Sequence, residues 1–166
     1  MTSNAYPTTW GANLLQDGTV RFRLWAPDEQ GLKLRCDAGD FTMEASGEGW
    51  FELVTDKVPV GGGYAFVLDD GSVVPDPAAR AQMDDVHGPS KVVDADSYEW
   101  QTERSGRPWE ETVIYEMHVG TFTPGGTFRS AIEKLPYLAE VGITAIEVMP
   151  VAQFTGEHGW GYDGVL

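Results

Sequence analysis

Cysteine, positive charge and long apolar runs are all scarce in this sequence. A single cysteine, Cys36, among 166 residues excludes an internal disulfide and any zinc site built from several cysteines. Lys and Arg number 11 against 26 Asp and Glu, and the resulting net charge of −15 repels nucleic-acid backbones and anionic membrane surfaces. We therefore expect neither nucleic acid nor membrane as a partner.

Targeting and membrane-spanning segments are also missing from the sequence. The opening residues lack a basic start followed by an apolar run, and no stretch approaches the roughly 18 consecutive apolar residues of a membrane helix. These absences predict a cytoplasmic protein. With 166 residues the chain is too short for a complete (β/α)₈ barrel, which needs about 250, but long enough for one domain and a remainder.

The first half of the chain carries apolar residues with a period of two, which is typical of strands with one buried face. Clusters of Gly, Asp and Ser separate these runs and indicate tight turns. Seven strands are expected, at residues 20–25, 32–36, 41–44, 50–54, 64–68, 72–74 and 91–93. Short strands at this spacing predict a β-sandwich, which we place at residues 8–96.

The pattern changes after a polar segment, residues 97–111, which we interpret as a linker. The run Val113–Val119 is nearly continuous in apolar residues and predicts a strand buried on both faces of a parallel sheet. A second run of this kind, Ile143–Met149, predicts another buried strand. Residues 112–166 are therefore expected to begin a parallel α/β domain.

Between these two runs, apolar residues recur at spacings of three and four and predict a helix. Thr127 is placed to cap its N-terminus, and Gly142 to follow its C-terminus. Pro136 should kink or divide this helix, because proline lacks a backbone donor and clashes one turn back. Strand, helix and strand together predict one β-α-β unit.

Few residues suggest chemistry by themselves. Glu116, His118, His158 and Asp163 are types that bind metals, but two strand residues and two distant loop residues make a poor ligand set, and we expect no metal site. The glycines at 61–63 lack the Lys-Ser/Thr pair of a phosphate loop and predict a turn. A glycosidase needs two carboxyl groups at a set separation, and the sequence identifies no such pair.

Six tryptophans are many for this length, and flat indole faces either stack on sugar rings or fill a sandwich core. We expect core positions for most of them, including Trp25, which ends a predicted strand. Trp160 lies in a glycine-rich stretch just beyond the second parallel strand, the edge at which barrel enzymes build their active sites. For Trp160 both interpretations stay open.

Several motifs resemble glycoside hydrolase family 13, the α-amylase superfamily. Residues 113–164, VIYEMHVGTFTPGGTFRSAIEKLPYLAEVGITAIEVMPVAQFTGEHGWGYDG, resemble the start of its catalytic barrel. The segments RFRLWAP (21–27), YAFVLDDG (64–71) and PDPAAR (75–80) resemble its N-terminal sandwich, related to carbohydrate-binding module family 48. The resemblance implies a multidomain β and α/β chain: an immunoglobulin-like β-sandwich followed by the first β-α-β unit of an incomplete (β/α)₈ barrel.

The resemblance also implies an activity. The combination of PDPAAR, DDVHGPSKVVD, HVGTFTPGGTF and WGYDG is most similar to members that release trehalose by hydrolysing an α-1,4 bond of maltooligosyltrehalose, without metal or organic cofactor. Branching or debranching of glycogen is the alternative activity. A different class of function is a non-catalytic module that binds α-glucan or another part of an enzyme.

Only a few functional positions follow from the resemblance. Tyr162 matches the aromatic residue on which the family stacks a sugar at the cleavage site, with Asp163 and Trp160 beside it. The family's catalytic carboxylates belong to motifs after later barrel strands, which these 166 residues do not include. The chain is therefore expected to be an inactive N-terminal portion that could self-associate through its barrel remnant.

Overall fold

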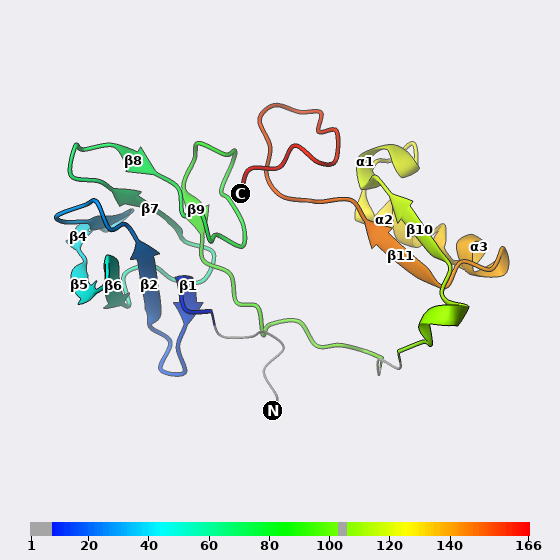
Figure 1. The fold of residues 1–166 in the computed structure, drawn as a ribbon, viewed down its shortest axis with the longest axis horizontal. Coiled ribbons are helices and arrows are strands. Elements are labelled where there is room, and N and C mark those ends of the chain that lie inside the picture. The colour runs from blue at the N-terminus through cyan, green and yellow to red at the C-terminus, as the bar shows by residue number, and fades with distance from the viewer. Residues whose placement is uncertain (1–7, 103–105) are drawn as a thin grey trace. The chain divides into compact units, whose positions relative to one another are not determined.

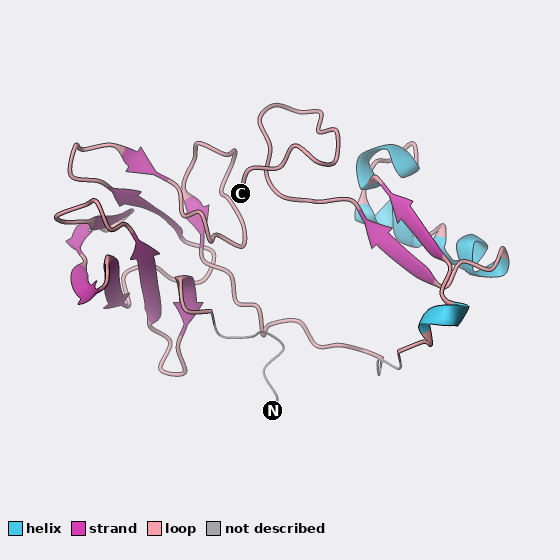
Figure 2. Cartoon of the chain, in the orientation of Figure 1, coloured by secondary structure: helices cyan, strands magenta, loops and turns pink. Residues whose placement is uncertain are grey.

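The computed structural model describes residues 8–102 and 106–166. The contacts within the chain divide it into two compact units. The first unit spans Met1–Glu99 together with Gln153–Gly156 and Val165–Leu166, and the second spans Trp100–Ala152 and Glu157–Gly164. Figure 2 shows strands in both units and helices only in the second. No helix in the described part of the chain combines the length and apolar character needed to cross a membrane.

The first unit consists of two antiparallel sheets (Figure 1). One sheet has the strand order β1-β2-β6-β5, and the other has the order β4-β3-β7-β8, with β9 also paired to β7. The strands are β1 (Gly11–Leu14), β2 (Val20–Trp25), β3 (Lys33–Cys36), β4 (Gly39–Thr42), β5 (Glu44–Gly47), β6 (Trp50–Thr55), β7 (Gly63–Val67), β8 (Val73–Val74) and β9 (Ser90–Lys91). The expected all-β character of this part is confirmed.

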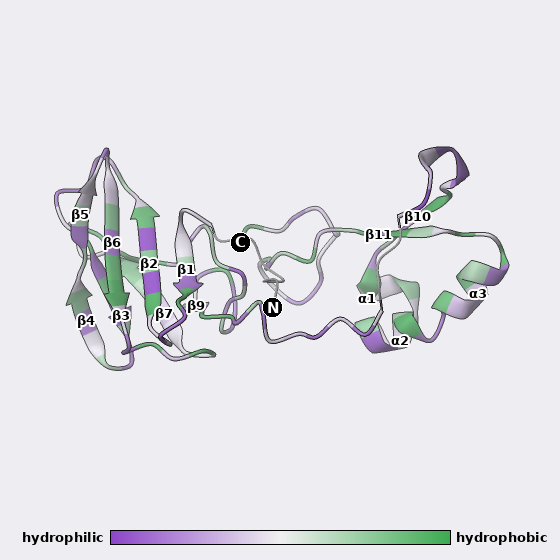
Figure 3. Cartoon of the chain, turned by 90° about the horizontal axis from the view of Figure 1, so that it is seen from below, coloured by the Kyte–Doolittle hydropathy of each residue, from purple (hydrophilic) through white to green (hydrophobic). Residues whose placement is uncertain are grey.

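The core of the first unit follows the alternation in the sequence. Figure 3 shows β2 changing between hydrophobic and hydrophilic residues along its length. Its residue Phe22 is fully buried and meets the ring of Tyr64 edge-on, with the ring centroids 4.8 Å apart. Tyr64 in turn meets Phe66, 6.0 Å away, on its own strand β7. Such edge-to-face aromatic pairs stabilise the core beyond the area that they bury.

The single strand expected at 41–44 is wrong, because the chain changes sheets there. β4 pairs with β3, whereas β5 pairs with β6 in the other sheet. Met43 lies between the two strands and is buried, and its backbone N–H donates to the oxygen of Leu32 at 2.9 Å. Because Met43 is apolar, it continues the alternating pattern of apolar residues in the sequence and hides the change of sheet. Strands β1 and β5, which have few apolar residues, were not expected.

The core position expected for Trp25 is also wrong. The indole of Trp25 is 58% exposed, and its Nε1–H donates to the backbone oxygen of Glu48 at 3.0 Å. Trp25 follows Leu24 in a strand whose side chains alternate between faces, so it lies on the outer face with Arg21 and Arg23. The other exposed tryptophans of the described residues are Trp10, Trp100, Trp109 and Trp160. The expectation that most tryptophans fill the core is therefore wrong.

The second unit contains the expected order of strand, helix and strand. It comprises the 3-10 turn η1 (Trp109–Glu111), strand β10 (Ile114–Met117), the helices α1 (Val119–Phe122), α2 (Phe128–Ile132) and α3 (Leu135–Glu140), and strand β11 (Ala145–Val148). β10 and β11 are parallel, with Ile114 opposite Ala145 and Met117 opposite Val148. Strand β10 ends earlier than expected, because His118 begins the short helix α1.

The local signals within the expected helix are confirmed. The Thr127 side chain accepts a hydrogen bond from the backbone N–H of Ser130, and Ser130 Oγ accepts one from the backbone N–H of Thr127, which forms a capping box. Two short helices replace one long helix, and Pro136 lies in the first turn of α3, where a missing backbone donor costs nothing. Gly142 follows α3 with φ +96°, in the left-handed region that favours glycine.

The two parallel strands are only partly buried in this chain. The side chains of Ile114, Tyr115, Ile146 and Val148 are each between 36% and 44% exposed. The buried residues packed together in this unit are Met117, Ala131 and Leu138, with Phe122 and Ile143 partly buried against them. A parallel strand becomes buried only when strands and helices cover both of its faces, and two strands with short helices cannot do so.

Candidate functional site

The candidate site lies where the loop after β11 returns to the end of β10. Because the two strands are parallel, their carboxyl ends share one edge, and polar residues that follow them meet there. The Tyr162 hydroxyl donates a hydrogen bond to Oε1 of Glu116 on β10. Glu116 pairs in register with Glu147 on β11. This contact connects residues 46 positions apart in the chain.

The acidic surroundings keep the Tyr162 phenol protonated. The hydrogen bond to Glu116 raises the pKa of Tyr162 above its ordinary value, and partial desolvation and the charges of Glu116 and Glu147 raise it further. The hydroxyl therefore donates throughout the neutral range. Its ring remains 66% exposed, so one end of the side chain is anchored while an aromatic face is open.

His118 anchors the same loop from the end of β10. Its Nε2 lies 3.0 Å from the backbone oxygen of Gly159, a geometry that fits the tautomer with hydrogen on Nε2. The other ring nitrogen, Nδ1, is buried and has no hydrogen-bond partner among the residues described. His118 therefore holds this loop against the end of β10.

Gly161 lets the loop approach the strand ends closely. Its φ is +99°, and a Cβ at this position would lie 2.7 Å from Met149 Cε and 2.9 Å from His118 Cδ2. Both the backbone conformation and the space therefore favour glycine. Gly161 was not among the residues expected at the site, although a glycine between two aromatic residues is the signal that could have identified a close approach.

Trp160, Tyr162 and Asp163, the three residues expected to bind substrate, all lie in one loop. The two carboxylate oxygens of Asp163 each lie 3.1 Å from the Trp160 backbone N–H, so Asp163 closes a turn around Gly161. The indole of Trp160 is 88% exposed. Tyr162 contacts Glu116, which the sequence analysis had considered only as a metal-binding type. In residues 8–102 and 106–166, no cluster of three or more His, Cys, Asp or Glu could hold a metal ion.

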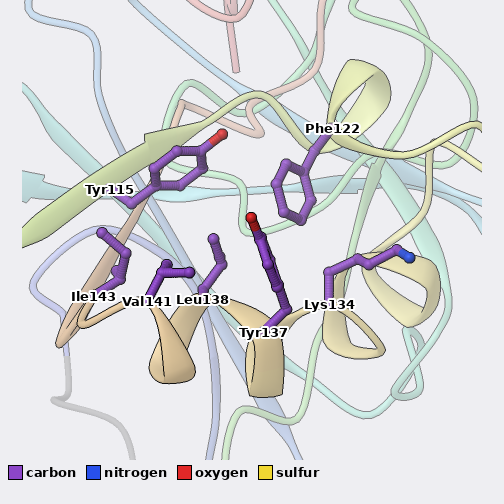
Figure 4. Close-up of a pocket in the computed structure, with 7 residues that line it drawn as sticks. All are labelled: Tyr115, Phe122, Lys134, Tyr137, Leu138, Val141 and Ile143. Atoms are coloured by element: carbon purple, nitrogen blue, oxygen red, sulfur yellow. The ribbon is translucent and has the colours of Figure 1, made fainter.

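A groove of about 700 Å³ lies in the second unit, apart from the loop of Tyr162 (Figure 4). Its lining residues are Tyr115, Phe122, Lys134, Tyr137, Leu138, Val141 and Ile143. Figure 4 shows these side chains around one hollow, with Tyr115 from β10 facing residues of α3. The lining holds no carboxyl group, and its polar side chains are the phenols of Tyr115 and Tyr137 and the amine of Lys134. This groove therefore has the character of a packing surface and lacks the chemistry of hydrolysis.

Comparisons with known proteins identify close relatives. No family model matches the sequence. A malto-oligosyltrehalose trehalohydrolase from Saccharolobus solfataricus is 50% identical over 95% of this chain, and a branching enzyme from Streptomyces avermitilis is 35% identical over 86%. A crystal structure from Salmonella typhimurium, described as an alpha amylase, is 60% identical over 96% of the chain, with a TM-score of 0.90.

The matches cover nearly all of this chain but only part of each relative. The chain spans 28% of the Saccharolobus protein, 19% of the branching enzyme and 28% of the Salmonella chain. Its mostly β fold with few helices matches the N-terminal part of α-amylase-family enzymes. The chain is thus a relative of the malto-oligosyltrehalose trehalohydrolases, within the α-amylase family, and corresponds to their N-terminal portion.

Proposed function

We propose that this chain is the N-terminal portion of a glycosidase that releases trehalose from maltooligosyltrehalose by hydrolysing an α-1,4 bond. The observation that carries the proposal is the 50% identity to a malto-oligosyltrehalose trehalohydrolase over 95% of the chain. The branching enzyme, at 35% identity, supports the alternative activity less well. The parent enzyme acts on a soluble glucan, and the proposed location is the cytoplasm.

The proposed architecture places residues 8–96 in an immunoglobulin-like sandwich of the carbohydrate-binding module family 48 type. Residues 97–111 form the linker, and residues 112–166 form the first β-α-β unit of a (β/α)₈ barrel. The parallel pairing of β10 with β11 supports the barrel assignment. The exposure of both strands supports it too, because the layers that cover such strands in a barrel come from other parts of the barrel.

In this proposal the loop of Trp160, Tyr162 and Asp163 forms one wall of the glucan site. The exposed ring of Tyr162 provides a face for a sugar, and Glu116 fixes the ring by accepting its hydroxyl proton in a hydrogen bond. Asp163 holds the loop through the Trp160 backbone, so we assign it a positioning role. Trp160, which is almost fully exposed, extends the aromatic surface outward.

The chain alone is proposed to be inactive. Glycoside hydrolysis needs a protonated carboxyl group to act on the leaving oxygen and a second, ionised carboxylate across the bond. Glu116 is engaged with Tyr162, and Asp163 with the Trp160 backbone. In our proposal the acid and the nucleophile come from barrel strands that this chain does not supply. Activity of the purified 166-residue chain above that of a buffer blank would contradict this point.

The experiment that tests the site compares Tyr162→Ala with wild type in the longer parent enzyme. Stacking on one aromatic ring, taken from base stacking as an analogue, is worth about 10- to 100-fold, and we expect kcat/KM to fall by that amount. Tyr137→Ala is the matched control, because this exposed tyrosine lies on helix α3, away from the loop. Equal kcat/KM for the Tyr162 variant and wild type would overturn the assignment.

A further inference from the structure

The loop after β11 forms a closed unit whose two ends are paired. The backbone N–H of Gln153 donates to the oxygen of Leu166 at 2.8 Å, and the N–H of Val165 donates to the oxygen of Gln153 at 2.7 Å. Residues 154–164, which lie between these pairs, have the length of an Ω-loop, a compact surface loop whose ends lie close together. We name residues 153–166 the Tyr162 loop (orange to red in Figure 1).

The neck of the Tyr162 loop is tightly packed as well as hydrogen-bonded. A Cβ at Gly164 would lie 2.6 Å from Ala152 Cβ and 3.3 Å from the Ala152 backbone oxygen, so glycine allows the two arms of the neck to approach. Fixing the ends of a loop removes conformational freedom from the residues between them. A contact that holds the neck therefore also restrains Tyr162.

The side chain of Gln153 provides such a contact. Its Nε2 donates to the backbone oxygen of Asp84 at 3.1 Å, across 69 positions in the sequence. Both residues of this bond belong to the first unit, whereas residues 157–164 of the loop belong to the second. We propose that Gln153 is a positioning residue of the glucan site, because its bond to Asp84 restrains the loop that presents Tyr162 to the sugar. This inference rests on the proposed function, in which Tyr162 forms part of that site.

The segment that accepts this bond is itself held in place. The N–H of Met83 donates to the oxygen of Pro89 at 2.9 Å, so Asp84 lies in a turn that leads directly into β9. β9 pairs with β7, where Ser90 lies opposite the fully buried Tyr64. The acceptor oxygen is therefore attached to the core of the first unit. A fixed acceptor makes the Gln153 bond an anchor for the neck.

The tip of the Tyr162 loop has anchors of its own. The Tyr162 hydroxyl donates to Glu116, and His118 Nε2 lies 3.0 Å from the Gly159 oxygen. The loop is thus held at both its neck and its tip before a sugar arrives, which lowers the entropy lost on binding. Without the Gln153 bond, the tip contacts and the backbone pairs of the neck hold the loop without the first unit's turn.

The test separates the side-chain bond of Gln153 from its backbone bonds. Gln153→Met keeps the length of the side chain but removes the donor, and Gln153→Lys keeps a donor of similar reach. In the 166-residue chain, Gln153→Met should lower the protection from hydrogen exchange of the bonded loop amides, those of Trp160 and Val165, and Gln153→Lys should restore it. Gln16→Met, at an exposed position after β1, is the matched control and should exchange as wild type does. Unchanged protection of the β7 amides shows that the first unit stays folded, and Gln153→Ala decides the question should Gln153→Met not fold.

The second readout is the activity of the longer parent enzyme. Loss of one neutral hydrogen bond is worth about two- to tenfold, and we expect kcat/KM of Gln153→Met to fall by that amount and Gln153→Lys to regain most of it. In a Tyr162→Ala background the same substitution should have no further effect, because Gln153 acts through Tyr162.

Two results would overturn the positioning role of Gln153. One is wild-type protection of the loop amides in Gln153→Met. The other is a loss of kcat/KM that is equally large with and without the Tyr162 ring, since Gln153 would then act elsewhere. The exchange measurement needs no substrate, so its failure is distinguishable from a failure of the proposed activity, which the products of the parent enzyme decide.

Discussion

The hydroxyl of Tyr64 donates a 2.7 Å hydrogen bond to Oδ2 of Asp76, and both side chains are fully buried. The second carboxylate oxygen, Oδ1, accepts the backbone N–H of Ala78 at 2.8 Å, and the Asp76 N–H donates to Ser90 Oγ at 2.9 Å. These bonds connect β7 and β9 with residues 76–78. A buried polar network of this kind is stable only while every member keeps its partner.

Removing the Tyr64 hydroxyl should destabilise the first unit. Tyr64→Phe keeps the ring in the core but leaves a buried carboxylate oxygen without its donor, which costs about 1–3 kcal/mol. Urea unfolding followed by tryptophan fluorescence measures the change. Tyr137→Phe is the matched control, because Tyr137 is 62% exposed in the second unit, and it should unfold as wild type does. An unchanged midpoint for Tyr64→Phe would contradict this role of the network.

Asp76 should make stability depend on pH in the direction opposite to that of a surface carboxylate. Burial raises the pKa of Asp76 above its ordinary value, although the bonds from Ala78 and Tyr64 counteract part of the rise. Its stabilising contribution is therefore full below the unfolded pKa of about 4 and is lost as pH rises through the higher folded pKa. Asp76→Asn cannot ionise and lacks this loss.

The measurement for Asp76 is the difference in unfolding free energy between wild type and Asp76→Asn, taken at several pH values. The difference should move in favour of the Asn variant as pH rises from 4 toward 8. Other titrating groups affect both proteins alike and cancel. A constant difference across this range, or a change in favour of wild type, would refute the raised pKa.

Gly161 and Gly156 form a matched pair for testing the close approach of the loop. Both have positive φ, at +99° and +88°, but only Gly161 has neighbours in the space of a Cβ. Gly161→Ala should expose the amides of the loop to faster hydrogen exchange than Gly156→Ala does, because the new methyl group displaces His118 and Met149 in addition to straining the backbone. Equal exchange rates in the two variants would show that the contact contributes nothing.

The apolar groove of the second unit should promote self-association as salt increases. Its lining includes Tyr137 and Val141, which are 62% and 56% exposed, while the net charge of −15 keeps copies apart at low ionic strength. Light scattering across a salt series should show a rising mass, and Val141→Gln should reduce it without changing the charge. Val54→Gln, an exposed position on β6, is the control. A constant monomer mass at every salt concentration would contradict this expectation.

Local chemistry is the part of this fold that the sequence could predict. The Thr127 cap, the division of the helix at Pro136 and the glycine after α3 each depend on neighbouring residues alone. The alternation of β2 likewise gave the buried Phe22 and Leu24. It also places Trp25 on the outer face, and the expectation of a core tryptophan was wrong because residue type was given more weight than position.

Features that depend on distant partners could not be predicted. The change of sheet at Met43 is determined by which strands pair, and alternation does not specify pairing. The exposure of Ile114 and Val148 depends on layers that other parts of a barrel provide. The contact of Tyr162 with Glu116 joins a loop to a strand 46 residues earlier, and only the parallel pairing brings the two together.

The central proposal is that the chain is the N-terminal portion of an enzyme that releases trehalose from maltooligosyltrehalose. The most direct measurement incubates the longer parent enzyme with maltotriosyltrehalose and identifies the products by chromatography and NMR. We expect free trehalose together with maltotriose, and no new α-1,6 linkage. Formation of α-1,6 branches from a linear α-1,4-glucan, with no trehalose released from maltotriosyltrehalose, would contradict the account and assign the parent to the branching enzymes.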